Sequence, residues 1–175
     1  MSFINIEFKA RTLHSDRIRQ YLIDHGAESR GTDAQTDTYF NVAHGRLKLR
    51  EGNIENNLIW YQRTNQAGPK QSDFILTPVA DAVALKQSLT NALGVKVAVV
   101  KRREIYFIGN VKFHLDVLEG LGHFVEVEAS NKIEDIPVER LREQCEQYRL
   151  AFGVGDDDLV QFSYSDLLLE KAAAK

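Results

Sequence analysis

Apolar and polar residues alternate along the first stretch of the chain, which reads Ile-Asn-Ile-Glu-Phe-Lys-Ala over residues 4–10. Successive side chains of a β-strand point to opposite faces, so this pattern predicts a strand with one apolar and one charged face. Similar stretches, separated by turn residues, predict further strands at 35–40, 46–50, 58–63, 70–76, 97–107, 111–117 and 123–129. Short strands joined by turns at this spacing indicate an antiparallel meander.

Other segments show the spacing of an amphipathic helix instead. A first helix is predicted over 15–25, a second over 82–93 and a third over 137–152, with a short one over 165–170. The second helix has the clearest ends, because the Asp81 side chain can cap its first turn and Gly94 can end it. Strands and helices together predict an α+β fold.

The composition limits the class of protein. The chain has 175 residues, is 43% hydrophobic and 27% charged, and carries a net charge of −3. We expect one soluble domain over 1–171 with a disordered tail over 172–175. The charge argues against a nucleic-acid partner, and the absence of 18 consecutive apolar residues argues against a membrane span. We therefore expect a cytoplasmic protein, either monomer or homodimer, and its single cysteine, Cys145, excludes an internal disulfide.

The charged faces of the predicted strands fall into two sets. Arg46, Lys48 and Arg50 share one face of a single strand, and like charges so close together need a counter-charge. The whole basic set is Lys9, Arg46, Lys48, Arg50, Arg63, Lys70, Lys101 and Arg103. The acidic set is Glu7, Asp116, Glu126 and Glu128.

Two arrangements satisfy these faces. In the first, they form the solvated outside of an ordinary sheet. In the second, the strands close, or nearly close, into an antiparallel barrel whose charged faces line a wet lumen while the aliphatic faces pack outward under the helices. Such a lumen suits one ligand class, because arginines and lysines can hold a chain of phosphates. Carboxylates can hold Mg²⁺ or Mn²⁺, which bridges phosphate oxygens.

The ordered motifs resemble those of the CYTH domain, or triphosphate tunnel metalloenzyme, superfamily, which includes class IV adenylyl cyclases and thiamine triphosphatases. The family's N-terminal Glu-x-Glu-x-Lys strand reads Asn-Ile-Glu-Phe-Lys over residues 5–9. The later matches follow in the family's order: Arg-Leu-Lys-Leu-Arg at 46–50, Tyr-x-Arg at 61–63, Lys-x-Ser at 70–72, Lys-Arg-Arg at 101–103, His-x-Asp at 114–116 and Phe-Val-Glu-Val-Glu at 124–128. Asn5 is the departure, because the family usually has a glutamate there.

The resemblance implies an eight-stranded tunnel with helices outside and assigns roles to both charge sets. The metal site would comprise Glu7, Asp116, Glu126 and Glu128. The phosphate path would be lined by Lys9, Arg46, Lys48, Arg50, Arg63, Lys70, Lys101 and Arg103. Lys9 and Glu7 are the expected catalytic residues, as candidates for activating a water. Asn5 can offer an oxygen to a metal but no charge, which weakens the case for a second ion.

Three functions are compatible with these residues. The leading one is divalent-metal-dependent hydrolysis of inorganic tripolyphosphate or of a nucleoside or other organic triphosphate. The second is a class IV adenylyl cyclase, in which the ribose 3′-hydroxyl attacks the α-phosphorus and releases pyrophosphate. The third is a module that binds a polyphosphate or nucleotide without turnover, and Asn5 keeps this possibility open.

Overall fold

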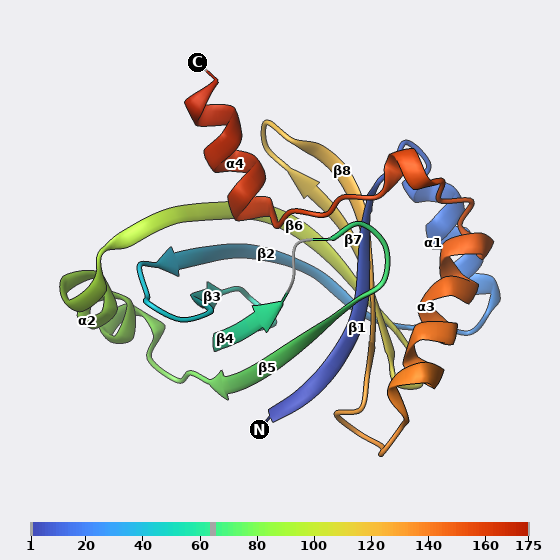
Figure 1. Cartoon of the computed structure of the whole chain (residues 1–175), viewed down its shortest axis with the longest axis horizontal. Helices are drawn as coiled ribbons and strands as arrows, with labels where there is room; N and C mark the ends of the chain where they lie inside the picture. The colour runs from blue at the N-terminus through green and yellow to red at the C-terminus, as the bar shows by residue number, and fades with distance from the viewer. Residues whose placement is uncertain (1, 64–65, 175) are drawn as a thin grey trace.

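A computed structural model describes residues 2–63 and 66–174 of the chain. Within these residues, eight strands form one closed barrel, as Figure 1 shows, and every neighbouring pair is antiparallel. The strands are β1 (Ser2–Arg11), β2 (Glu28–Phe40), β3 (Arg46–Glu51), β4 (Asn57–Arg63), β5 (Lys70–Pro78), β6 (Val95–Ile108), β7 (Val111–Leu118) and β8 (Gly122–Ser130). The predicted α+β fold with an eight-stranded antiparallel barrel is confirmed.

The order of the strands around the barrel is β1-β5-β4-β3-β2-β6-β7-β8. β1 closes the ring, because it pairs with β5 on one side and with β8 on the other. In this ring β3 is four strands away from β8, so the predicted basic strand faces the predicted acidic strand across the lumen.

The larger of two apolar clusters lies outside the barrel, between its wall and two helices, and a smaller one that includes Tyr39, Ile59 and Tyr61 lies on the inner side of the wall. Helices α1 (Ser15–Asp24) and α3 (Val138–Ala151) lie side by side over β1 and β8, at the right of Figure 1. Ile6 and Phe113 from the strands and Leu141 from α3 are fully buried in the cluster between them. On β1 and β8 the aliphatic faces therefore point outward under these helices, and the charged faces point inward.

Two further helices and one 3₁₀ turn complete the chain. Helix α2 (Ala82–Leu93) contacts β2 and β3, and Asp81 caps it by accepting a hydrogen bond from the backbone N–H of Ala84 at 3.0 Å, as predicted. The 3₁₀ turn η1 (Asp156–Asp158) precedes α4 (Tyr164–Ala173), which contacts β6. None of the helices in the described part of the chain is both long and apolar enough to cross a membrane.

Two segment boundaries differ from the pattern-based ones more than the others do. β2 begins at Glu28, whereas alternation predicts a strand only from residue 35. Residues 28–33 are mostly exposed and polar, and pairing with β6 rather than alternation makes them a strand. α4 continues to Ala173, two residues into the segment expected to be a disordered tail. The single-domain extent of 1–171 stays a prediction.

Candidate functional site

A cavity of about 680 Å³ lies inside the barrel, and side chains from all eight strands line it. Six of the eight cations expected on the phosphate path belong to this lining: Lys9, Lys48, Arg50, Arg63, Lys101 and Arg103. A charge buried without a partner is costly, so these cations need anions beside them.

Asp37, on β2, is the counter-ion of one group of cations. Its carboxylate accepts two hydrogen bonds from the Arg50 guanidinium, each 2.9 Å long. The ammonium groups of Lys48 and Lys101 donate to the same carboxylate at 3.1 and 2.8 Å. Burial would raise the pKa of Asp37, but these three cations hold it well below its usual range. Burial lowers the pKa of Lys101 to about 7, because Asp37 offsets only part of the desolvation and Arg103 adds repulsion.

The turn between β3 and β4 brings a second anion, Glu55, to the cavity. Asp33 holds this turn by accepting hydrogen bonds from the backbone N–H groups of residues 53, 54 and 55 at 2.7, 3.0 and 2.9 Å. Arg50 donates to Glu55 at 3.0 Å, and Lys112 forms a close ion pair with it. Burial would raise the pKa of Glu55, but Lys112 and Arg50 lower it below its usual range.

Arg103 and Asp116 form a buried pair between β6 and β7. Two hydrogen bonds, 2.7 and 2.6 Å long, join the guanidinium to the two carboxylate oxygens. The Tyr164 hydroxyl donates to Asp116 at 2.7 Å, and Arg103 also donates to Glu126 at 3.1 Å. Protein donors therefore occupy both carboxylate oxygens of Asp116. Its two hydrogen bonds to Arg103 hold the guanidinium in an orientation that also reaches Glu126. A direct metal contact for Asp116 stays a prediction.

Glu7 and Lys9 project from β1 into the same cavity. Glu7 forms a close ion pair with Arg63 of β4. The Lys9 ammonium lies 3.9 Å from the centre of the Tyr164 ring, a cation–π distance. Burial lowers the pKa of Lys9, although the nearby Glu126 carboxylate opposes this. Both side chains are in place to meet a ligand, and their catalytic roles stay predictions.

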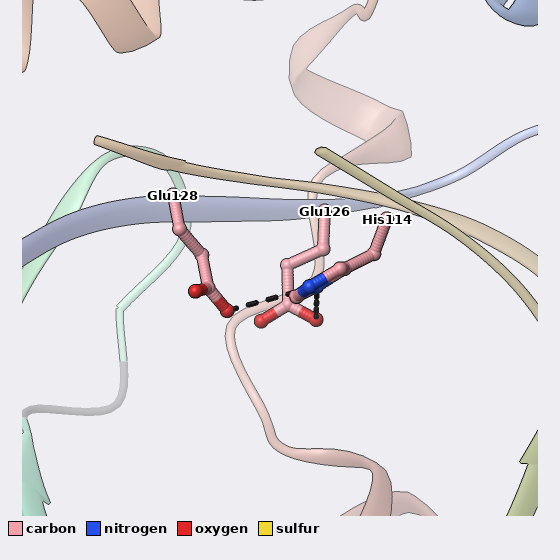
Figure 2. Close-up of side chains that lie close together, drawn as sticks. All are labelled: His114, Glu126 and Glu128. Carbon is pink, nitrogen blue, oxygen red and sulfur yellow. Dashed lines mark ion pairs between the residues drawn. The ribbon is translucent and has the colours of Figure 1, made fainter. Parts of the chain in front are cut away.

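Glu126 and Glu128 of β8 meet His114 of β7 at one wall of the lumen (Figure 2). Each of the three offers one ligand atom, and these atoms lie within 4.8 Å of one another. Burial raises the pKa of Glu128 to about 8, with Glu126 and Glu7 adding repulsion. Burial also lowers the pKa of His114 to about 3, with Arg103 adding repulsion. The wall therefore concentrates carboxylates at low solvent exposure, an arrangement that a cation would stabilise.

Two expected phosphate-binding cations have other partners. Arg46 donates to Asp166 of α4 at 2.9 Å. Lys70 is 1% exposed and donates to the backbone carbonyl of Gln161 at 2.9 Å. Neither belongs to the cavity lining. Arg46 thus links β3 to α4, and Lys70 links β5 to the segment before α4; their binding to phosphate stays a prediction.

Aromatic rings form the flank of the cavity near the start of β1. The Phe3 and Phe74 rings stack with centroids 5.7 Å apart, and Phe74 stacks on Tyr61 at 5.3 Å. All three residues line the cavity, and Phe3 and Phe74 are partly exposed. This flank offers an apolar surface next to the charged part of the lumen.

The structure thus brings together most of the predicted site, and it adds residues that sequence reasoning missed. Asp37 and Lys112 could have been found, because each lies on the charged parity of its strand. Glu55 carried no signal, because it lies in a polar turn whose folding over the barrel only the tertiary structure decides. Tyr164 precedes the expected start of the last helix and likewise had no pattern to mark it.

The closed eight-stranded barrel with a charged lumen is the architecture of the triphosphate tunnel class. The chain belongs to the CYTH domain family, whose model matches residues 4–161. A comparison with curated proteins found no match to the sequence.

Several solved structures share the fold. The chain is similar to the PH1012 protein from Pyrococcus horikoshii, with a TM-score of 0.77, 23% identity and 93% and 98% of the two chains covered. It is also similar to a candidate adenylate cyclase from Vibrio parahaemolyticus, with a TM-score of 0.77, 21% identity and 94% and 97% covered. The candidate adenylyl cyclase HpAC1 from Hippeastrum has a TM-score of 0.60, 12% identity and 98% and 96% covered. At these identities the similarity is one of fold.

Proposed function

We propose that the protein hydrolyses a triphosphate compound inside the barrel with the help of a divalent cation. One observation carries the proposal: a single cavity has Lys48 and Arg50 on one wall and Glu126 and Glu128 on the wall across from it. A triphosphate complexed with a divalent cation has matching charges, with phosphate oxygens for the basic wall and the cation for the acidic wall. Family membership and the Hippeastrum neighbour, described as having a dominant triphosphatase activity, support the same reading.

The residues of the acidic wall fit a divalent cation such as Mg²⁺ or Mn²⁺. Glu126 and Glu128 offer carboxylate oxygens, and Glu7 lies near enough to raise the pKa of Glu128. The Asn5 amide oxygen is buried without a hydrogen-bond partner in the described structure, which marks a place for a positive ligand. When bound, the cation would polarise a phosphate oxygen and offset the negative charge that develops there.

The protein's own cations would bind the phosphate oxygens and position the substrate. Lys48, Arg50 and Lys101 would exchange their contacts with Asp37 for contacts with phosphate oxygens. Arg103 would be held in position by Asp116. Lys9, whose pKa is lowered by burial, and Glu7 both line the cavity, and they would orient a water toward the terminal phosphorus.

Product analysis tests the proposal directly. Purified protein would be incubated with tripolyphosphate or ATP and with Mg²⁺ or Mn²⁺, and the products separated by chromatography. We expect orthophosphate that appears only with the metal. Absence of any product, with clear thermal stabilisation by triphosphate, would instead indicate the non-catalytic binding module.

Matched variants test whether the activity resides in the lumen. Glu126→Gln should lower turnover at least about tenfold, because it removes a charged ligand. Lys48→Ala should raise KM about tenfold through the loss of a charge-assisted contact. Lys86→Ala is the control for the latter, because Lys86 pairs with Glu51 on the outside of the barrel. Equal effects of the Lys48 and Lys86 variants would mean that the lumen is not the binding site.

The aromatic flank favours a second candidate, an adenylyl cyclase. Phe3 and Phe74 could stack on a base while the phosphates extend into the charged part of the cavity. The similarity to a candidate adenylate cyclase from Vibrio parahaemolyticus is compatible with this function. Cyclic AMP and pyrophosphate formed from ATP, without orthophosphate from tripolyphosphate, would establish the cyclase and exclude the hydrolase.

A further inference from the structure

His114 is a buried imidazole placed directly against two carboxylates. It pairs with Glu126 in the register of β7 and β8, so both side chains point into the lumen at the same level. Its Nδ1 lies 3.7 Å from one oxygen of Glu126 and 3.7 Å from one oxygen of Glu128 (Figure 2). The imidazole is 1% exposed, and neither ring nitrogen has a hydrogen-bond partner among the described residues.

A hydrogen-bonded ion pair does not account for this geometry. Charge-assisted N–H···O bonds are about 2.8 Å long, and the observed separations are nearly an ångström greater. Arg103 already donates to the Glu126 oxygen that lies nearest to the imidazole, at 3.1 Å. Burying both ring nitrogens without partners costs free energy, so a ligand between the three side chains would stabilise the arrangement.

The spacing suits a metal ion. Two ligand atoms that bind one ion through bonds of about 2.1 Å lie roughly 3 to 4 Å apart. The Nδ1 atom and the two carboxylate oxygens need little movement to reach that distance. Beside them, the Asn5 amide donates to Glu128 at 3.5 Å, and its own oxygen has no hydrogen-bond partner in the described structure. The surroundings therefore provide a nitrogen donor, two carboxylates and a neutral amide oxygen.

We propose that His114, with Glu126 and Glu128, binds a divalent first-row transition metal through the imidazole nitrogen and makes the site prefer Mn²⁺ or Co²⁺ over Mg²⁺. Imidazole suits transition metals, whereas Mg²⁺ is bound almost entirely through oxygen and retains several waters. The inference deepens the proposed function, because the same ion would serve the triphosphate. It is nevertheless measurable as binding, without turnover.

The test compares metal affinities of the chelator-treated protein by calorimetry with Co²⁺, Mn²⁺ and Mg²⁺. The wild type should bind Co²⁺ at least about tenfold more tightly than Mg²⁺. In His114→Gln the Co²⁺ affinity should fall about tenfold or more, while the Mg²⁺ affinity changes less than about twofold. Equal losses for both metals, or no loss for Co²⁺, would overturn the proposal.

His123→Gln is the matched control. His123 lies on the same strand as Glu126 and Glu128, but it is exposed on the opposite parity. Its substitution should leave all three affinities unchanged. A second variant, His114→Asp, replaces the nitrogen donor with oxygen and should reduce the preference for Co²⁺ over Mg²⁺ at least about threefold. An undiminished ratio of Co²⁺ to Mg²⁺ affinity in this variant would contradict nitrogen ligation.

One measurement needs no variant and therefore does not depend on how well the variants fold. In the Co²⁺-loaded wild-type protein, imidazole protons close to the ion should give paramagnetically shifted NMR signals. Their absence at saturating Co²⁺ would overturn the inference. Histidine-dependent Co²⁺ binding without triphosphate hydrolysis would overturn the proposed function and leave this inference intact. Triphosphate hydrolysis without histidine-dependent Co²⁺ binding would overturn this inference and leave the proposed function intact.

Discussion

At the scale of single residues, the lumen is a network in which the protein's own anions occupy the cations that a triphosphate would need. The single carboxylate of Asp37 contacts three cations, Arg50, Lys48 and Lys101. Such a carboxylate has two effects: it makes the burial of the cations tolerable, and it competes with an incoming phosphate for them.

Replacing Asp37 separates these two effects. We expect Asp37→Asn to lower the free energy of unfolding by about 3 kcal/mol, because three buried cations lose their shared counter-charge. Tripolyphosphate should then raise the melting temperature of the variant more than that of the wild type. Asp73→Asn, on the exposed face of β5, is the control and should change little. A melting temperature equal to that of the wild type would show that water, rather than Asp37, balances the charges.

Lys101 should make triphosphate binding pH-dependent. Its pKa is lowered to about 7, so the free protein at pH 8 holds Lys101 largely neutral. Phosphate oxygens favour the charged ammonium and raise this pKa, so binding takes up a proton and the affinity falls as the pH rises, by up to about tenfold per pH unit.

Calorimetry at pH 8 in two buffers of different ionisation enthalpy measures this uptake. Lys101→Arg stays protonated at pH 8 and should abolish both the uptake and the pH dependence. Wild-type binding at pH 8 without a proton taken up would contradict the lowered pKa.

At the scale of elements, the β3–β4 turn decides where Glu55 lies. Gly52 begins the turn, and a Cβ there would lie 2.6 Å from a carboxylate oxygen of Asp33 and 2.8 Å from the carbonyl oxygen of Glu55. Any side chain at this position would therefore push the Asp33 carboxylate away from the backbone N–H groups that donate hydrogen bonds to it.

Gly52→Ala should loosen the turn. We expect faster amide hydrogen exchange at residues 53–55 and a loss of roughly 2 kcal/mol in the free energy of unfolding. Gly155→Ala is the control, because the nearest atom to its added Cβ would be an Asp158 oxygen at 3.5 Å, an ordinary contact. Unchanged exchange at 53–55 would mean that Asp33 does not hold the turn.

At the scale of the whole molecule, the larger of the two apolar clusters lies outside the barrel, under α1 and α3. Ile6 of β1 is fully buried between the wall and the helices, whereas Ile75 of the neighbouring β5 is 45% exposed. Stability should therefore depend more on the contact of β1 and β8 with α1 and α3 than on the uncovered outer face of β5.

Truncation of the two isoleucines tests this arrangement. Ile6→Ala should cost about 3 kcal/mol of unfolding free energy, because it leaves a cavity under the helices. Ile75→Ala should cost about 1 kcal/mol or less, because much of its side chain already meets water. Denaturant unfolding of both variants gives the comparison, and similar costs would mean that the outer core is not the main source of stability.

Much of this organisation is predictable, because it depends on local patterns. Alternation along a strand sorts side chains onto two faces, and that sorting placed Lys9, Arg50 and Glu126 together on the charged side. Pattern could not extend β2 back to Glu28, since long-range pairing with β6 decides that part of the strand. Nor could it show that Arg46 and Lys70 turn to Asp166 and Gln161, because those partners lie about a hundred residues away.

The sequence by itself determined the strands, the helices, the family resemblance and the two charge sets, because periodicity and residue type are local properties of the chain. Only the tertiary structure decided which cationic side chain contacts which carboxylate. Closure of the ring set β3 across from β8 and brought Glu55 over the cavity. The register of the β7–β8 hairpin put His114, whose ring nitrogens have no hydrogen-bond partner among the described residues, beside Glu126 and Glu128. Strand pairing and its register fix those positions, and the alternation of residue types along one strand does not specify either.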